Sequence, residues 1–213
     1  MSEWGQETGS TDVIARNATV GAIILAGGLG QRLRTVGLKP FLLHGGKSFL
    51  QIAVENVFWN GLHPVAIVTN EVLYPRIASL VPNARILVNP QPERGMLSSV
   101  HIGLAAIGSE CSGIFLCPID YPLVQASTFH RLLQAHLSFP ECIVQPMFNG
   151  RCGHPIVLPP SLFDAIMATP LTEGVRSMIH KYAQLRNPIV VDDPGILINV
   201  NTPEIYYQYC QRG

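Results

Sequence analysis

Charge is scarce in this chain, and no long apolar run is present. Only 13% of its 213 residues are charged, and 14 Lys and Arg balance 14 Asp and Glu. No segment is rich in Lys or Arg, and no apolar run approaches the roughly 20 residues that a membrane-spanning helix needs. Nucleic acid and membranes are therefore not expected partners. Any bound anion must be held by local groups and a metal rather than by the field of the whole protein.

Cysteine is also sparse and irregularly spaced. The five cysteines are odd in number and form no C-x-x-C pair, so we expect neither a disulfide framework nor a structural zinc site. Cys111, Cys117 and Cys142 lie in or beside apolar runs, where cysteine usually serves as a small core residue. Met1 to Ala18 lack the apolar core of a secretory signal, so residues 1–19 are expected to form a disordered polar tail. We expect a cytoplasmic protein.

Strand-like and helix-like segments alternate through the first part of the chain. The expected strands are at 22–26, 64–69, 84–88 and 113–118, and the expected helices are at 48–60, 74–81, 95–107 and 127–137. Such alternation is typical of α/β proteins. It predicts a mostly parallel sheet with helices on both faces and a ligand at the carboxyl ends of the strands.

The rhythm changes from about residue 141. The expected elements are strands at 142–146, 154–158, 189–191 and 196–200, helices at 161–167 and 172–183, and a last helix from Thr202. Asn149-Gly150 is a turn signal between the first two strands, and Asp192-Asp193 is expected to form a solvated turn. We expect one domain over 20–213, made of a first half, 20–140, and a second half, 141–213, that adds a small β extension.

The segment after the first expected strand carries the clearest chemistry. The apolar run ends in Gly27, Gly28 and Gly30, and Arg32, Arg34 and Lys39 follow. Glycines let the backbone turn sharply and bring its N–H groups close to an anion, while the cations neutralise phosphate charge. This loop therefore indicates a nucleoside triphosphate site.

Two common glycine motifs do not fit. The dinucleotide fingerprint needs a small residue where Leu33 stands and an acidic residue about 20 positions further on, near Leu50, where none occurs. A P-loop ending at Gly46-Lys47-Ser48 would need a glycine in place of Phe41. The Gly-Lys-Ser segment is therefore expected to be a surface turn before a helix.

Oxygen ligands for a metal follow later strands. Asp120 comes directly after an apolar strand, where its carboxylate could hold Mg²⁺ or simply begin a turn before Pro122. Asn199 and Asn201 alternate with apolar residues and face the same way if 196–200 is a strand. Capping of the helix at Thr202 could explain Asn201, but it does not explain Asn199.

Five ordered segments together resemble the molybdenum cofactor nucleotidyltransferase family over about residues 20–206. They are L-A-G-G-L-G-Q-R-L, N-P followed by G-M-L-S-S, I-D-Y-P, G-R-C-G-H-P and N-V-N-T-P-E. The resemblance implies a Rossmann-like α/β fold of the nucleotide-diphospho-sugar-transferase type. It also implies Mg²⁺-dependent transfer of CMP or GMP from an NTP to the phosphate of molybdopterin, with release of pyrophosphate. Residues 20–140 would then form the nucleotide-binding half and residues 141–213 the acceptor-binding half. The second and fourth segments are similar to the cytidylyl branch, whereas Ala26-Gly27-Gly28 is similar to the guanylyl branch.

The resemblance assigns roles to individual residues. Arg32, Lys39 and Asp120 are the expected catalytic residues, and Asp120 with Asn199 or Asn201 would hold Mg²⁺. His154 and Arg176 would lie near the acceptor, although the histidine could be structural and the arginine could cap a surface. The expected nucleotide-binding residues are Leu25, Ala26, Gly27, Gly28, Gly30, Arg32, Lys39, Asn89, Gly95, Ser98 and Ser99.

The loop departs from the family pattern in one respect. Lys39 lies seven residues after Arg32, whereas the resemblance leads us to expect about five. The longer spacing is similar to sugar-phosphate nucleotidyltransferases, so another phosphorylated small molecule is an alternative acceptor. Asn199 and Asn201 stand where many relatives have carboxylates. A protein that binds nucleotide but does not catalyse the transfer is therefore a further alternative. CTP and GTP both remain candidates, and the oligomeric state is not indicated.

Overall fold

The computed structural model describes residues 19–28, 30–33 and 35–210. Residues 1–18 of the expected tail and Arg34 lie outside this part of the chain. The strands are β1 (Val20–Leu25), β2 (Leu43–His44), β3 (Lys47–Ser48), β4 (Val65–Thr69), β5 (Arg85–Val88), β6 (Gly113–Pro118), β7 (Ile143–Phe148), β8 (Arg151–Cys152), β9 (Ile156–Leu158) and β10 (Arg186–Val190). The helices are α1 (Phe49–Trp59), α2 (Tyr74–Leu80), α3 (Met96–Ile107), α4 (Ala126–Ser138), α5 (Phe163–Met167), α6 (Val175–Lys181) and α7 (Pro203–Tyr209). None of the helices in the described ranges combines the length and the apolar character that a bilayer crossing needs.

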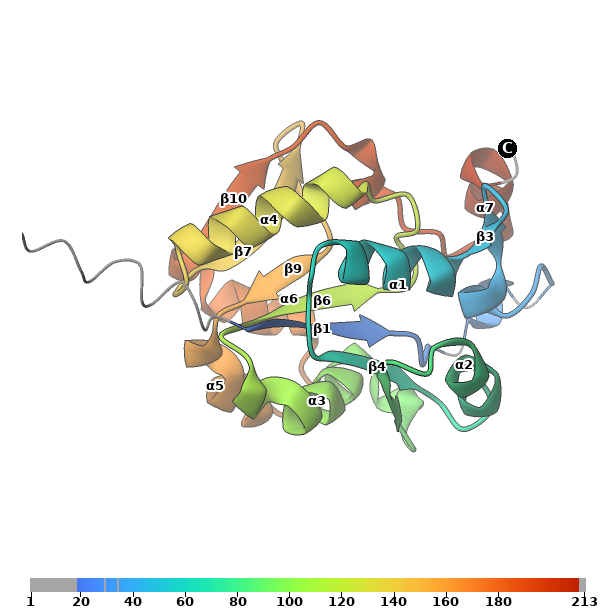
Figure 1. The fold of residues 1–213 in the computed structure, drawn as a ribbon, viewed down its shortest axis with the longest axis horizontal. Coiled ribbons are helices and arrows are strands. Elements are labelled where there is room, and N and C mark those ends of the chain that lie inside the picture. Colours follow the sequence, from blue (N-terminus) through green and yellow to red (C-terminus); the bar gives the residue numbers. More distant parts are fainter. Residues whose placement is uncertain (1–18, 29, 34, 211–213) are drawn as a thin grey trace, which may run out of the picture.

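One eight-stranded sheet runs through the molecule in the order β10-β7-β9-β6-β1-β4-β5, with β8 paired to β7. β1 is parallel to β4 and β6, and β9 is antiparallel to β6 and β7. Leu25 pairs with both Val68 and Pro118, so these strands end together. Figure 1 shows the arrowheads of β1 and β6 pointing to the same end of the sheet. The glycine loop after β1 therefore lies beside the segment after β6.

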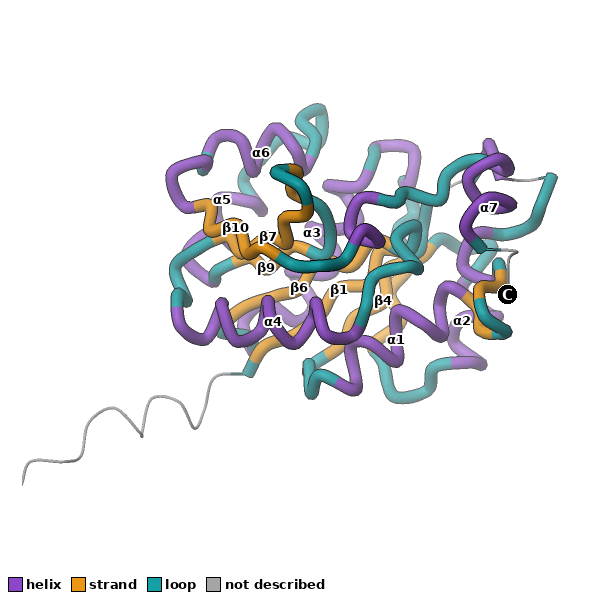
Figure 2. Tube along the Cα trace, turned by 90° about the horizontal axis from the view of Figure 1, so that it is seen from above, coloured by secondary structure: helices purple, strands orange, loops and turns teal. Residues whose placement is uncertain are grey.

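Helices cover both faces of the sheet, as the alternation predicted. Along β1, Ala22 and Ile24 belong to one buried cluster, whereas Ile23 and Leu25 belong to the other. This alternation follows from the two-residue period of a strand. Side chains of α1, α2, α4 and α7 join the first cluster, and those of α3, α5 and α6 join the second. Figures 1 and 2 show α1 and α4 side by side on one face.

Local sequence signals set several element boundaries. Ser48 begins α1 with a capping box, in which its hydroxyl accepts from the Gln51 backbone N–H and the Gln51 side chain accepts from the Ser48 N–H. Gly45 and Gly46, with φ of +56° and +77°, form the turn of the β2–β3 hairpin. The expected turn at Asn149-Gly150 joins β7 to β8, again with positive φ. Both predicted turns are thus present.

The expected strand at 196–200 was wrong. Residues Pro194–Leu197 form a 3₁₀ helix, η8, and the next residues are irregular. Two close contacts hold this segment out of the sheet. The Ile196 carbonyl accepts from the His154 backbone N–H at 3.1 Å, and a Cβ on Gly195 would lie only 2.1 Å from the Leu123 carbonyl oxygen. Tertiary packing, rather than apolar alternation, decides the local conformation.

The expected solvated turn at Asp192-Asp193 was also wrong for its second residue. Asp192 is exposed, but Asp193 is only 2% exposed. Its carboxylate accepts from the Gln125 backbone N–H at 2.9 Å and from the Thr128 hydroxyl at 2.6 Å. It also accepts from the Gly195 N–H at 2.9 Å. Asp193 therefore caps the amino end of α4 from a distant part of the chain and fixes η8 against it.

All five cysteines are free. Cys111, Cys117 and Cys210 are buried, and Cys142 and Cys152 are partly buried. Burial raises the pKa of the Cys117 thiol, so this group stays protonated near neutral pH. The core role expected for Cys111 and Cys117 is thus confirmed, while Cys142 is only half buried.

Candidate active site

The glycine loop after β1 borders a cavity of about 200 Å³, which we call the loop cavity. Its lining comes from the ends of β1 and β6, from η3 (Lys39–Phe41) and from the start of α3. Carboxyl ends of strands are the usual place for a ligand in such sheets. The loop cavity brings together seven residues that the sequence predicted: Leu25, Gly27, Gly28, Lys39, Gly95, Ser99 and Asp120.

Close packing explains one of the loop glycines. A Cβ on Gly27 would lie 3.0 Å from the Thr69 carbonyl carbon and 3.2 Å from its oxygen. Those atoms belong to the backbone at the end of β4, so they have little freedom to move. Gly28 has open space at the same position, so its backbone is accessible to a ligand. Gly30 has a φ of +53°, which favours glycine.

A lysine, a carboxylate and an amide converge at the edge of the loop cavity. The Lys39 Nζ lies 3.4 Å from Asp120 Oδ2 and donates a hydrogen bond to the Asn201 side-chain oxygen. The Lys39 and Asp120 side chains are only 12% and 14% exposed. The Val200 backbone N–H donates to the Asp120 carbonyl at 2.8 Å, which brings the late asparagine segment alongside β6. Asp120 and Asn201 thus share one cationic partner.

Asn199 lies in a different environment from Asn201. Its Oδ1 is buried and has no hydrogen-bond partner among the described residues. Its side chain lies beside the Tyr121 hydroxyl. Burial raises the pKa of Tyr121; the Asn199 side chain opposes this shift, and the negative charge of Asp120 adds to it. The Asn199 oxygen is therefore an acceptor available to a ligand.

The oxygen atoms at this site suit a hard cation that takes only one or two ligands from the protein. The described residues include no group of three or more His, Cys, Asp and Glu that could hold a metal ion. Asp120 and an asparagine oxygen are hard oxygen donors, and Mg²⁺ typically binds one or two carboxylates together with substrate phosphates and water. A site of this kind fits Mg²⁺ better than zinc, which prefers nitrogen and sulfur ligands.

Asn89 organises the start of α3 from within the protein. It is only 1% exposed, and its Nδ2 donates to Ser98 Oγ at 2.8 Å and to Ser99 Oγ at 2.9 Å. Its Oδ1 accepts from the Gln91 backbone N–H at 2.9 Å. Ser98 Oγ in turn donates to the Gly95 carbonyl at 2.7 Å. Of Asn89 and the two serines, only Ser99 lines the loop cavity.

A second cavity of about 680 Å³, which we call the large cavity, contains the two residues predicted to contact the acceptor. His154 and Arg176 line it, and so do Arg151 and Arg186. Met96 lines both cavities, and Tyr121, next to Asp120, lines the large cavity. The two cavities therefore adjoin each other at these residues.

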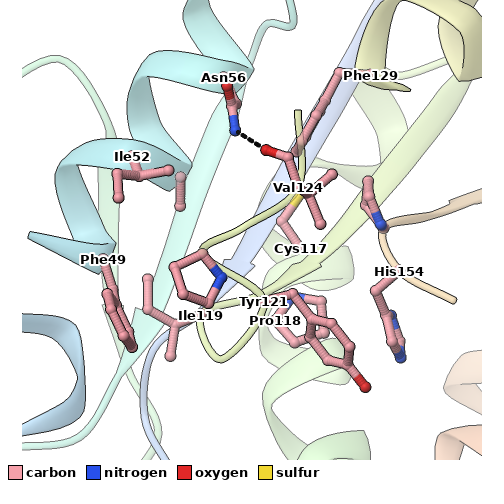
Figure 3. Close-up of a pocket in the computed structure, with 13 residues that line it drawn as sticks. Phe49, Ile52, Asn56, Cys117, Pro118, Ile119, Tyr121, Val124, Phe129 and His154 are labelled. Carbon is pink, nitrogen blue, oxygen red and sulfur yellow. Dashed lines mark hydrogen bonds between the residues drawn. The ribbon is translucent and has the colours of Figure 1, made fainter. Parts of the chain in front are cut away.

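His154 is held between β8 and β9. Its ring centroid is 4.7 Å from that of Tyr121, and Figure 3 shows the two rings side by side beside a small apolar pocket. A Cβ on Gly153 would lie 2.1 Å from the Ile196 carbonyl oxygen, so this glycine permits the close packing that places the histidine. Burial lowers the pKa of His154, and the charge of Asp120 only partly opposes this. The imidazole is therefore neutral at pH 7.

Several predicted residues lie outside the lining of both cavities. Arg32 is exposed on η2 (Gln31–Leu33), and Ala26 is buried with its N–H donating to the Val68 carbonyl at 2.8 Å. Gly30 lies at the turn before Arg32. The predicted contacts of these residues with a nucleotide, and those of Asn89 and Ser98, stay predictions.

Sequence reasoning missed most of the residues that line the large cavity, among them Tyr121, Arg151 and Arg186. Tyr121 and Arg151 lie inside the I-D-Y-P and G-R-C-G-H-P segments, so those motifs could have indicated them. Arg186 lies in no recognised motif, and only the sheet order brings it to the cavity.

Comparison with known proteins identifies the family. A family model described as "MobA-like NTP transferase domain" matches residues 22–186. No curated protein sequence matches the chain.

Solved structures share the fold at low sequence identity. Rv0371c from Mycobacterium tuberculosis H37Rv has a TM-score of 0.74 and 19% identity, covering 90% of this chain and 97% of that one. A second structure of Rv0371c is a complex with manganese (TM-score 0.72, 15% identity, 92% of this chain and 100% of that one). A nucleotidyl transferase from Methanothermobacter thermautotrophicus (Mth528) has a TM-score of 0.71 and 18% identity, covering 89% and 95% of the two chains. A 4-diphosphocytidyl-2C-methyl-D-erythritol synthase from Anaerococcus prevotii has a TM-score of 0.70 and 15% identity, covering 92% and 97%.

These structures confirm the expected Rossmann-like α/β fold with a mostly parallel sheet. The family model spans well over half of the chain, and its match includes the glycine loop, Lys39 and Asp120. The chain therefore belongs to the family of MobA-like NTP transferase domains and is a nucleotidyltransferase.

Proposed function

We propose that this enzyme transfers CMP or GMP from CTP or GTP to the phosphate of molybdopterin in a Mg²⁺-dependent reaction. The observation that carries the proposal is the convergence of Lys39, Asp120 and Asn201 beside the glycine loop. This arrangement provides a cation, a carboxylate and an amide oxygen at one point, next to backbone that can approach phosphates. The five sequence segments that resemble the molybdenum cofactor enzymes support the choice of acceptor.

The reaction needs positioning and charge neutralisation more than covalent help from the protein. An oxygen of the acceptor phosphate forms a bond to the α-phosphorus of the NTP. The bond from that phosphorus to the oxygen bridging to the β-phosphate breaks, and its electron pair leaves with pyrophosphate. Negative charge is redistributed around the α-phosphate and builds up on the departing group.

Each residue near the loop cavity has a role in this chemistry. The backbone N–H groups of Gly27, Gly28 and Gly30 would bind the β- and γ-phosphates. The Lys39 ammonium would turn from Asp120 to the α-phosphate, and Arg32 would neutralise the leaving pyrophosphate. Asp120, together with Asn199 or Asn201, would hold the Mg²⁺.

When bound, Mg²⁺ would supply positive charge that offsets the negative charge of the phosphates. The manganese complex of Rv0371c supports use of a divalent cation at this fold. The free acceptor oxygen of Asn199 and the carboxylate of Asp120 supply the oxygen ligands that such an ion takes.

A second candidate keeps the reaction and changes the acceptor to a sugar phosphate or another phosphorylated small molecule. The spacing of seven residues from Arg32 to Lys39 favours it. The similarity to the 4-diphosphocytidyl-2C-methyl-D-erythritol synthase supports the same candidate. The name of that enzyme describes a product in which the cytidylyl group is attached to a small sugar-alcohol derivative and not to molybdopterin.

Nucleotide binding provides the first test. Thermal unfolding is measured with CTP, GTP, UTP and ATP, each with Mg²⁺. A nucleotide at 100 times its dissociation constant should stabilise the protein by about 2.7 kcal/mol. The base with the largest effect identifies the donor, and the absence of stabilisation by any triphosphate would contradict the proposal.

Turnover provides the second test, with pyrophosphate release measured in the presence of that NTP and molybdopterin or sugar phosphates. Asp120→Asn should lower the rate roughly 100- to 1,000-fold, since one preorganised charge-stabilising group is worth about that much. Asp164→Asn, a change at an exposed aspartate on α5, should leave the rate unchanged. Nucleotide binding without pyrophosphate release on any acceptor would instead identify a non-catalytic relative.

A further inference from the structure

The large cavity concentrates positive charge that no carboxylate offsets. Arg151, Arg176 and Arg186 line it, and its lining within the described ranges includes no Asp or Glu. Within the described ranges, none of the three arginines forms an ion pair. A guanidinium stays charged at any physiological pH. The cavity is thus matched to a ligand with more than one negative charge.

Arg186 is oriented by a buried neighbour. Its Nε donates to the Gln145 Oε1 at 2.9 Å, and Gln145 is only 7% exposed. The two residues lie on adjacent parallel strands, where Pro188 pairs with Gln145, so Arg186 shares a face with that pair. With Nε engaged, the two Nη groups have no hydrogen-bond partner within 19–28, 30–33 and 35–210, and they can bind a carboxylate or phosphate through two parallel hydrogen bonds.

The register of the sheet places Arg186 far from Asp120, which lies after the carboxyl end of β6. β10 lies three strands from β6, which is roughly 14 Å across the sheet. Arg186 pairs with Ile143 on β7. Because Val157 on β9 pairs with both Val144 and Phe115, Arg186 lies at the same level along the strands as Ile114 on β6. Asp120 lies beyond the far end of β6, so the two backbones are separated by roughly 20 Å. One phosphate group cannot contact both side chains.

Arg151 occupies the opposite end of the cavity. It pairs with Phe148 at the carboxyl end of β7. The carboxyl ends of β7 and β6 lie at the same end of the sheet, because both strands are antiparallel to β9. The positive charges therefore extend along the cavity instead of surrounding a single point. Arg151 lies toward the end of the sheet where Asp120 lies, and Arg186 lies away from that end.

We propose that Arg186, held by Gln145, binds a second anionic group of the acceptor, remote from the phosphate that attacks the nucleotide. The acceptor is accordingly an elongated small molecule with a phosphate at one end and a carboxylate or a further phosphate at the other. This inference rests on the proposed nucleotidyl transfer and specifies the chemical class of its acceptor. It favours the second acceptor candidate, a phosphorylated small molecule with a further anionic group, over molybdopterin, whose single phosphate is the reacting one.

The test uses alkyl phosphates as probes, in a three-carbon and a ten-carbon version, each with and without a terminal carboxylate. Dissociation constants are measured by calorimetry with the protein saturated by its NTP and Mg²⁺. The carboxylate should tighten binding of the ten-carbon probe at least tenfold and leave the three-carbon probe unchanged. No gain from the carboxylate at either length would overturn the proposal.

Variants assign the effect to the arginine. Arg186→Gln should abolish the gain, and Gln145→Leu should reduce it, because the guanidinium keeps its charge but loses its orientation. Arg131→Gln removes the same charge from α4, on the other face of the sheet, and should keep the full gain. A gain that survives in a folded Arg186→Gln protein would refute the assignment, and Gln145→Leu provides an independent measurement if that variant does not fold.

The experiment separates the two levels of inference. Stabilisation of the wild-type protein by NTP and Mg²⁺ is measured first. Its absence would count against nucleotidyl transfer itself, whereas its presence without a carboxylate effect would remove only the second anion site.

Discussion

The two cavities hold their positive charge in different ways. In the loop cavity, Lys39 is already paired with Asp120 and Asn201, whereas the three arginines of the large cavity have no ionic partner among the described residues. A nucleoside triphosphate arrives with a metal ion that offsets part of its charge, so a single lysine suffices there. An acceptor brings no such ion, and the protein must supply the compensating charge. The contrast suggests that donor and acceptor are bound by separate electrostatic means.

The largest effect is expected for loss of the lysine in the loop cavity. Lys39→Met should lower pyrophosphate release roughly 100- to 1,000-fold. The developing negative charge on the α-phosphate would no longer be neutralised by Lys39, the one lysine in the described lining of the loop cavity. Steady-state kinetics should show the loss in kcat more than in KM for the acceptor.

Lys181→Met is the matched control, since Lys181 pairs with Glu173 on the surface. It should retain the full rate. If Lys39→Met retained it as well, the loop cavity would not be where the chemistry occurs.

The next effect concerns the support of the large cavity. Asp193→Ala should lower the free energy of unfolding by about 3 kcal/mol, because three donors, two of them in buried hydrogen bonds, lose their acceptor together. Urea unfolding measures the change. Asp192→Ala, one residue earlier and exposed, should stay within about 0.5 kcal/mol of the wild type. Equal stability of the two variants would show that the cap at α4 contributes little.

The loop cavity could be predicted because its parts are local in the sequence. A buried strand ending in glycines determines β1 and its loop, and Asp120 follows another such strand directly. Parallel pairing then requires the two ends to meet. The expected helix start at Gly95 also follows from local signals, and it places Ser99 at the same cavity.

The large cavity could not be predicted in the same way, because long-range contacts build it. Apolar alternation at 196–200 indicated a strand, but packing of Gly195 against Leu123 produces a 3₁₀ segment instead. Asp193 carries an ordinary turn signal and is nevertheless buried as a cap for a helix about 65 residues earlier. Arg186 reaches the cavity only because β10 joins the sheet beside β7.

A smaller effect should distinguish the start of α3, which Asn89 organises, from the large cavity. Asn89→Ala should weaken NTP binding about tenfold, since Ser98 and Ser99 lose the donor that orients their hydroxyls. Binding of the acceptor in the large cavity should not change. Calorimetric titration with each ligand measures both quantities. Asn83→Ala, at an exposed loop position, is the control, and weaker acceptor binding in Asn89→Ala would show that the two regions are coupled.

The smallest effect is a pH dependence that belongs to neither cavity. His136 on α4 is 1% exposed, and its Nε2 lies 3.0 Å from the Ser112 carbonyl oxygen. Burial lowers the pKa of His136, and the Ser112 carbonyl and Glu141 only partly oppose this. Because the unfolded chain then takes up a proton at higher pH than the folded one, stability should fall as pH drops through about 6.5 and stop falling below the folded pKa. His136→Gln should flatten this slope in urea unfolding between neutral and acid pH, whereas His130→Gln, exposed on the same helix, should keep it. If His136→Gln kept the same slope, the acid sensitivity would instead come from His154, the half-buried histidine of the large cavity whose pKa is also lowered.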